Sequence, residues 1–164
     1  PISSLDVSVQ ATVMNLLVQL QKATGVSYLF ISHDMAAVRY LSDWIAVVYL
    51  GKILEIGPAE DVFKPPFHPY TEALLSAIPV VDTRARPERI RLMDSVLSSV
   101  TIPSGCRFHN RCPRKLGEIC EQEVPPWLDD GKQHRIRCHI PLDQLRKLQD
   151  SKDAVPLAHP TGGH

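Results

Sequence analysis

The chain has 164 residues, with 18 lysines and arginines against 18 aspartates and glutamates, 44% apolar residues and four cysteines. This length predicts one compact domain, or a small domain with an appendage, and the apolar share is sufficient for a buried core. The balanced charge argues against a largely disordered chain, and against a nucleic-acid-binding module whose whole surface contacts phosphates. The balanced charge does not exclude a local patch of charged residues.

The apolar runs are too short to cross a bilayer. The longest are Tyr28 to Ile31 and Trp44 to Leu50, whereas a spanning helix needs about 20 apolar residues. The chain opens with Pro1, and no basic stretch is followed by a long apolar one, so we expect no secretory signal. We also expect that an earlier part of the protein is missing before Pro1.

The first predicted element is an amphipathic helix. Its apolar residues recur at helical spacing, at Val9, Val13, Leu16, Leu17 and Leu20. Asp6 or Ser8 is placed to cap the start of this helix, and Gly25 to end it. A second, shorter helix is predicted over residues 35–41.

Two apolar runs predict strands that are buried on both faces of a parallel sheet. They cover residues 26–31 and 45–50 and do not alternate with polar residues. A turn at Gly51-Lys52 leads into a third strand, residues 53–56, which Gly57-Pro58 is expected to end. The order helix, strand, helix, strand, strand predicts an α/β fold with an antiparallel hairpin at one edge of the sheet.

Composition divides the chain into three regions. Residues 1–64 carry the α/β pattern, residues 65–144 are rich in proline, arginine and cysteine, and residues 145–164 form a polar stretch that we expect to be flexible. The segment from Pro65 to Tyr70 is expected to form a rigid turn that clasps the sheet to the cysteine region and then starts a helix. Residues 84–91, with four arginines, are expected to be an exposed linker.

Ser32-His33-Asp34 follows the first predicted strand and precedes a helix. In open α/β sheets ligands bind at this carboxyl end of the strands, so a histidine here can reach a substrate or a phosphate. The alternative is structural: Asp34 caps the helix and His33 is a surface histidine. A single histidine is a weak signal, and the spacing alone favours this alternative.

Several blocks resemble the second half of an ATP-binding cassette (ABC) ATPase. They are SSLDVSVQA at residues 3–11, FISHDM at 30–35 and YLGK at 49–52, in that order. Residues 68–79 and 105–113 extend the similarity to the ATPases of dipeptide and oligopeptide importers. The resemblance covers residues 1 to about 140, and it departs from the family pattern at Ser4 and around residues 94–99.

The resemblance implies specific roles for two residues. Asp6 corresponds to the D-loop aspartate, which crosses the ATPase dimer interface, and His33 to the switch histidine, which contacts the γ-phosphate of ATP and orients the attacking water. Both act in phosphoryl transfer, which requires charge stabilisation and an in-line nucleophile. The phosphate loop, the signature sequence and the Mg²⁺-binding carboxylates lie upstream in this family, and no G-x-x-x-x-G-K-[ST] occurs in this chain. We therefore expect these 164 residues to be inactive alone.

The resemblance also implies a fold and partners. The fold is the C-terminal part of a RecA-like ATP-binding cassette domain, followed by a small Cys-rich, metal-stabilised domain. The partners are a second ATPase subunit, two transmembrane permeases and, indirectly, an external peptide-binding protein, which places the subunit peripherally on the cytoplasmic face of the cell membrane. No nucleic-acid partner is expected. The alternative is a metal-stabilised interaction module without ATPase activity.

The cysteines are the strongest chemical signal inside the chain. Intervals of five, seven and seventeen residues separate Cys106, Cys112, Cys120 and Cys138. Disulfides are disfavoured because the sequence shows no export signal. Four thiolates suit either zinc or an iron–sulfur cluster, and the absence of paired Cys-x-x-Cys motifs leaves these two alternatives equally open.

The resemblance favours the iron–sulfur alternative, because importer ATPases with such cysteine spacing carry a [4Fe–4S] cluster in this region. All four cysteines are then expected ligands, with Zn²⁺ as the alternative metal. His109, His134 and His139 are possible substitute ligands. Basic residues close in sequence can offset the charge of an anionic cluster, namely Arg107, Arg111, Arg114, Lys115, Arg135 and Arg137. A solvated basic face, or one that binds lipid headgroups, is the alternative for this group.

Overall fold

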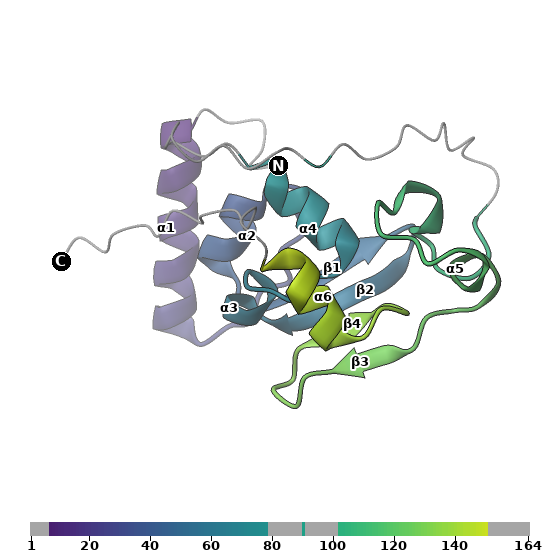
Figure 1. Ribbon diagram of the computed structural model, residues 1–164. Coiled ribbons are helices and arrows are strands. Elements are labelled where there is room, and N and C mark those ends of the chain that lie inside the picture. The colour runs from purple at the N-terminus through teal and green to yellow at the C-terminus, as the bar shows by residue number, and fades with distance from the viewer. Residues whose placement is uncertain (1–6, 79–89, 91–101, 151–164) are drawn as a thin grey trace. The chain divides into compact units, whose positions relative to one another are not determined.

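The computed structural model describes residues 7–78, 90 and 102–150 (Figure 1). Contacts within the chain divide it into two compact units, Pro1–Asp43 and Trp44–His164. The predicted linker at residues 84–91 lies outside the described residues except for Ile90.

The first unit contains two helices, as predicted. Helix α1 spans Val7–Thr24 and helix α2 spans Met35–Leu41. Gly25 ends α1 with a φ of 68°, and its N–H donates to the carbonyl of Gln21 at 2.8 Å. Ser8 lies inside α1, so it is not the cap, and Asp6 lies outside the described residues.

Asp34 begins α2 and links it to α1. Its Oδ1 accepts the N–H groups of Ala36 and Ala37, at 2.9 and 3.2 Å, as an N-cap residue does. Its Oδ2 accepts a hydrogen bond of 3.2 Å from Gln10 Nε2 on α1. The two helices are therefore joined by the side chain that the sequence identifies as a capping residue.

The predicted buried strand at residues 26–31 is wrong for this structure. The segment has no strand geometry, and Leu29 and Ile31 are 90% and 87% exposed. A parallel strand needs a neighbour to pair its backbone groups, and helices to cover its faces. The described residues provide neither for this segment, so apolar composition alone does not make it a strand.

The second unit is built on an antiparallel sheet, with the strand order β1-β2-β4-β3. The strands are β1 Trp44–Tyr49, β2 Lys52–Pro58, β3 Trp127–Asp129 and β4 Arg135–Arg137. The predicted hairpin is confirmed, but its turn is at Leu50-Gly51, where both φ angles are positive, at 45° and 72°. Gly57 and Pro58 remain in β2, paired with Ile45 and Trp44. The sheet is thus antiparallel throughout the described strands, in place of the expected parallel arrangement.

The helices of the second unit are short. They are α3 Ala59–Val62, α4 Pro69–Ser76, the 3₁₀ helix η2 His109–Arg111, α5 Glu118–Gln122 and α6 Leu142–Gln149. Pairing of β2 with β4 joins residues on both sides of the boundary predicted at residue 64. Helix α6 enters the region predicted to be flexible, and Leu145 and Gln149 are 0% and 5% exposed.

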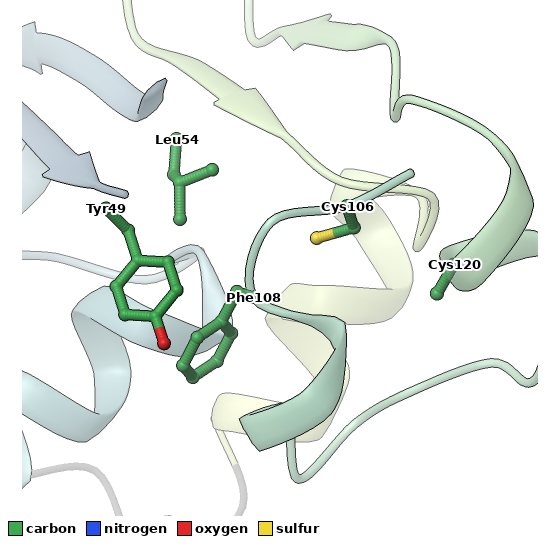
Figure 2. Packing of buried hydrophobic residues seen from close by; sticks show 5 residues of the cluster. All are labelled: Tyr49, Leu54, Cys106, Phe108 and Cys120. Atoms are coloured by element: carbon green, nitrogen blue, oxygen red, sulfur yellow. The ribbon is translucent and has the colours of Figure 1, made fainter. Parts of the chain in front are cut away.

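Aromatic rings connect the sheet to the cysteine region. Tyr49 on β1 packs with Leu54, Phe108 and two cysteines in one buried cluster (Figure 2). Tyr70 of α4 lies between the two parts, with ring centroids 4.8 Å from Tyr49 and 5.2 Å from Phe108. The predicted clasp is confirmed by this packing, which buries the aromatic rings on both sides.

A buried carboxylate ties three segments of this unit together. Glu55 on β2 is 0% exposed, and its Oε2 accepts the N–H of His68 at 2.9 Å. Its Oε1 is 2.7 Å from Nε2 of His134. Gly57 permits this approach, since a Cβ there would lie 3.0 Å from His134 Cα. Both groups of the ion pair are therefore fixed by close packing.

The same pair has perturbed proton affinities. Burial raises the pKa of Glu55, although the hydrogen bond with His134 opposes this. Burial lowers the pKa of His134, but the hydrogen bond and charge of Glu55 outweigh it, so that the pKa is raised. The folded chain therefore holds protons that the unfolded chain releases as the pH rises.

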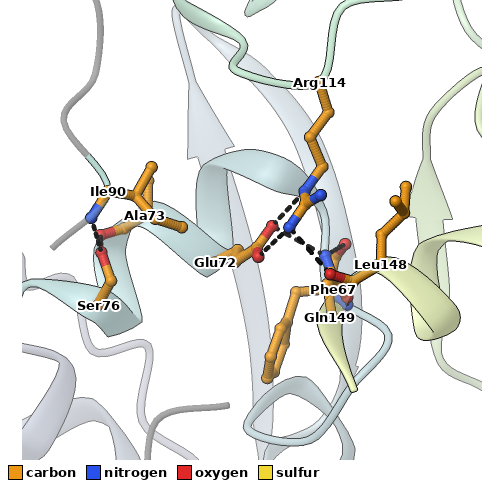
Figure 3. Close-up of polar contacts among 8 residues, drawn as sticks. All are labelled: Phe67, Glu72, Ala73, Ser76, Ile90, Arg114, Leu148 and Gln149. Carbon is orange, nitrogen blue, oxygen red and sulfur yellow. Dashed lines mark hydrogen bonds and ion pairs between the residues drawn. The ribbon is translucent and has the colours of Figure 1, made fainter. Parts of the chain in front are cut away.

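A second polar network joins α4, the cysteine region and α6 (Figure 3). Arg114 donates two hydrogen bonds to the carboxylate of Glu72, at 2.9 and 2.6 Å. Gln149 Nε2 donates to the same carboxylate and to the carbonyl of Phe67, both at 3.0 Å. The bidentate geometry makes this a strong link between elements distant in sequence.

We predict that the Glu55–His134 pair contributes stability that falls as the pH rises, whereas the lowered pKa of buried His68, about 3, acts in the opposite direction. The pair's stabilisation is complete below the ordinary histidine pKa of about 6.5 and is lost as the pH rises through the raised pKa of His134. Urea midpoints measured at about pH 6 and about pH 8 test this. Glu55→Gln keeps a hydrogen-bonding amide but removes the charge, and it should make the urea midpoint less dependent on pH. His139→Gln is the control, and its midpoint should change with pH as that of the parent chain does. The contribution of the pair is the difference between the parent chain and Glu55→Gln, since His68 is present in both; the same change of midpoint with pH in the two would contradict the prediction.

Candidate functional site

His33 lies in an exposed loop directly before α2 in the first unit. Ser32 Oγ accepts the N–H of Asp34 at 3.0 Å, which shapes the loop beside it. His33 itself makes no hydrogen bond or ion pair with any described residue. Asp34 caps α2, as the structural alternative predicts. The imidazole of His33 is exposed to solvent. Its role toward ATP, and that of Asp6, remain predictions.

The cysteines come from four short segments of the second unit. Cys106 follows Gly105, and its N–H donates to the carbonyl of Cys120 on α5 at 2.9 Å. Gly105 has a φ of 59°, and a Cβ there would lie 2.6 Å from the same carbonyl. This glycine is thus required for the close approach of the two cysteine segments.

The other two cysteines end secondary-structure elements. Cys112 follows η2, and Cys138 follows β4. Three of the thiols are buried, at 7% exposure for Cys106 and 9% for both Cys120 and Cys138, and none of the four forms a disulfide. The sheet, η2 and α5 therefore direct cysteines that are distant in sequence into one part of the unit.

The thiols influence one another electrostatically. Burial raises the pKa of Cys112 to about 12, and the charges of the other three thiolates raise it too. Burial also raises the pKa of Cys138 to about 11, with further increases from Cys106 and Cys120. Deprotonation of one thiol therefore disfavours deprotonation of the next, unless a cation offsets the charge.

The described residues contain no group of three or more histidine, cysteine or carboxylate side chains placed to hold a metal ion. The expected metal centre is therefore not supported by the geometry. The donor types nevertheless suit a cluster, since four free thiols share one region. Arg111, next to Cys112 in sequence, has a buried Nε with no hydrogen-bond partner in the described part of the chain.

The three candidate substitute ligands are engaged elsewhere. Nδ1 of His109 is 2.8 Å from the carbonyl of Cys106, and Nε2 of His139 is 3.1 Å from that of Glu123. His134 is held by Glu55. Each imidazole therefore already has a structural partner.

Four of the basic residues near the cysteines contact other side chains of this unit. Arg114 is bound to Glu72, and Lys115 pairs with Glu121. The guanidinium groups of Arg135 and Arg137 lie 5.6 and 5.2 Å from the ring centroid of Trp127. The hydrogen bond and charge of Glu72 raise the pKa of Arg114, and the thiolate of Cys112 adds a smaller contribution.

Sequence reasoning missed two carboxylates with distant partners, the buried Glu55 and the partly buried Glu72. Glu55 bonds to a histidine 79 positions away, and Glu72 to an arginine 42 positions away. The only sequence signal was the position of Glu55, a carboxylate within an otherwise apolar strand. Such separations are set by folding, so a local pattern cannot reveal the pairing.

Comparisons with known proteins identify relatives over most of the chain. A probable peptide ABC transporter ATP-binding protein of Sinorhizobium fredii is 48% identical over 140 residues, which are 85% of this chain and 39% of that protein. Oligopeptide transport ATP-binding protein AppF of Bacillus subtilis is 43% identical over 142 residues, 85% of this chain and 43% of AppF. The chain thus spans about two fifths of the length of these relatives.

The chain is related to the ATP-binding subunits of ABC transporters, as the residues quoted from its sequence indicate. More narrowly, it belongs to the peptide-transporter branch: residues 54–120 match the family model described as the oligopeptide/dipeptide transporter C-terminal region. This model covers β2, α4 and the segments that carry Cys106, Cys112 and Cys120.

Among the described residues, no helix is both long and apolar enough to cross a membrane.

We predict that Gly105→Ala destabilises the cysteine region. The new methyl group meets the carbonyl of Cys120 at 2.6 Å, and the left-handed backbone adds strain. Gly131→Ala is the matched control, because its φ of 78° carries the strain with nothing within 4 Å. We expect a loss of about 1 kcal/mol in the control and about 2–3 kcal/mol in Gly105→Ala, by urea denaturation. Faster reaction of Cys120 with a thiol reagent should accompany the larger loss, and equal losses in both variants would refute the clash.

Proposed function

We propose that this chain is the C-terminal portion of the ATP-hydrolysing subunit of an importer for dipeptides or oligopeptides. The observation that carries the proposal is the similarity over 85% of the chain to ATP-binding proteins of peptide transporters. On this proposal the first unit completes the RecA-like ATPase domain. The exposed apolar residues Leu29 and Ile31 then pair as a strand with parts of that domain outside this chain.

His33 is proposed to contact the γ-phosphate of ATP and to orient the attacking water. Its exposure, and its place in a loop fixed by the Asp34 cap, support this role, since a catalytic side chain needs access and a rigid base. Asp6 is proposed to act across the interface with a second ATPase subunit. ATP and Mg²⁺ are held by residues outside this chain, and Mg²⁺ supplies charge neutralisation at the phosphates.

The remaining proposals concern location and partners. The subunit is proposed to lie at the cytoplasmic face of the membrane, bound to two permease subunits, to which an external binding protein delivers the peptides. The relatives are named as ATP-binding proteins of peptide transporters, which supports a role in peptide transport. The kind of peptide is proposed to be chosen by these other subunits.

A chimera with AppF tests the proposed ATPase role. The part of this chain that matches AppF, 43% identical over 142 residues, replaces the corresponding part of AppF. We expect the chimera to hydrolyse ATP and to support oligopeptide uptake. His33→Ala should lower hydrolysis by about 10² or more while ATP binding is retained, since the histidine acts mainly in the transition state.

The control in the chimera is His139→Ala, which removes an imidazole from the second unit and should leave hydrolysis unchanged. Asp6→Ala should reduce hydrolysis in the assembled dimer. ATP binding by each variant shows that it is folded. Full activity of the His33→Ala chimera would refute the role of His33, and a folded chimera without any ATPase activity would contradict the proposed function.

We also propose that the four cysteines hold a [4Fe–4S] cluster. The support is that the four thiols are free, that three of them are buried, and that they lie close enough to raise one another's pKa. Each cysteine of such a cluster binds a different iron, so the sulfurs lie farther apart than around a single zinc ion with its Zn–S bonds of about 2.3 Å. When bound, the cluster supplies charge that offsets the thiolates. The chain's own contribution is to hold the sulfurs and exclude water.

Metal analysis of anaerobically purified chain tests the cluster. We expect roughly four iron and four sulfide per chain, with a brown colour. Cys112→Ser should lose most of the iron, whereas Asn110→Ala, an exposed neighbour, should keep it. Colourless protein with bound zinc would show that the cysteines hold zinc and not the cluster. Protein with neither metal would contradict the proposal and indicate a purely structural role for the thiols.

A further inference from the structure

One strand of the second unit carries apolar side chains on both of its faces. The sequence of β1 is WIAVVY, and its burial alternates, so that Ile45, Val47 and Tyr49 are buried and the residues between them are exposed. Tyr70 of α4 packs against Tyr49 on the buried face. An uninterrupted apolar run is typical of a strand that is covered on both faces. In this structure β1 buries only one of its two apolar faces.

The exposed residues of β1 continue onto β2 and form one apolar surface. Residues that pair across antiparallel strands lie on the same face of a sheet, and Ala46 pairs with Ile56 and Val48 with Ile53. We call the surface made by Trp44, Ala46, Val48, Ile53 and Ile56 the apolar sheet face. Trp44, Val48 and Ile53 are 51%, 54% and 38% exposed. These side chains therefore lie together, unlike the scattered apolar residues of an ordinary protein surface.

β1 is also an edge strand of the sheet. The strand order β1-β2-β4-β3 gives it one neighbour, β2, among the described strands. Proteins protect exposed edges with charged residues, proline or a covering element, because the free N–H and C=O groups of an edge pair with other strands. β1 contains neither a charged residue nor a proline. β3, at the other edge, ends in Asp129 and lies beside Arg135 and Arg137. The composition of β1 thus suits an internal strand, and that of β3 suits an edge.

We propose that β1 is an internal strand of the complete subunit, with its free edge and the apolar sheet face covered by the portion that precedes this chain in its relatives. This inference rests on the proposed function. The chain spans about two fifths of the length of these relatives, and the family model that it matches is a C-terminal region. A portion of that size can supply both a strand for the edge and a helix for the face. A second copy that paired edge to edge would leave the apolar sheet face uncovered.

Thiol labelling compares the face in the complete 164-residue chain and in the AppF chimera. Val48→Cys places a thiol on the apolar sheet face with a small change in volume. Val124→Cys is the matched control, since Val124 is 63% exposed and lies outside the strands. Mass spectrometry of the peptides separates each new thiol from the four native cysteines. We expect Val48→Cys to react on the order of 100-fold more slowly in the chimera than in the chain alone, and Val124→Cys to differ by less than about threefold.

Hydrogen exchange tests the edge in the same two proteins. Deuterium uptake by the segment that contains β1 should be lower in the chimera, whereas uptake by the segment that contains β3, the other edge strand, should be unchanged. Equal exchange of β1 in both proteins would overturn the proposal.

The labelling has further outcomes that count against the proposal. Shielding of Val48→Cys in the chain alone that grows with protein concentration would assign the apolar sheet face to a second copy. A chimera that hydrolyses ATP but leaves Val48→Cys as reactive as in the chain alone would refute this inference and retain the proposed function. A chimera that does not fold would contradict both.

Discussion

The buried carboxylate of Glu55 is the interaction on which the second unit depends. It lies on a central strand, and it accepts hydrogen bonds from the main chain of His68, which begins α4, and from the imidazole of His134, which precedes β4. A carboxylate without partners at 0% exposure is costly, so both contacts must form together. This requirement positions α4 and the β3–β4 hairpin on the same sheet.

The cysteine region is held by that arrangement. Cys138 follows the strand that pairs with Glu55's strand, and the rings of Tyr49, Tyr70 and Phe108 pack between the sheet and Cys106. Arg114, two residues after Cys112, is fixed by Glu72 of α4. A cluster bound by these thiols would therefore join segments that already share a core.

The two units differ in how completely they are folded by their own residues. The second unit buries Leu54, Phe108 and Ile136 almost fully, whereas the first exposes Leu29 and Ile31. Apolar residues that remain exposed at this level mark surfaces that need a partner. This contrast agrees with a chain whose curated relatives are more than twice as long. The catalytic role proposed for His33 requires the remainder of an ATPase domain.

The sequence by itself determined what local periodicity and capping encode. Helices at 7–24 and 35–41, the cap at Asp34, the β1–β2 hairpin and the family all followed from residues close together in the chain. Only the tertiary structure decided the antiparallel sheet order, the failure of residues 26–31 to form a strand, and the pairing of Glu55 with His134. The physical reason is that a strand or a buried charge is stable only with its partner, and these partners are chosen by folding across many tens of residues.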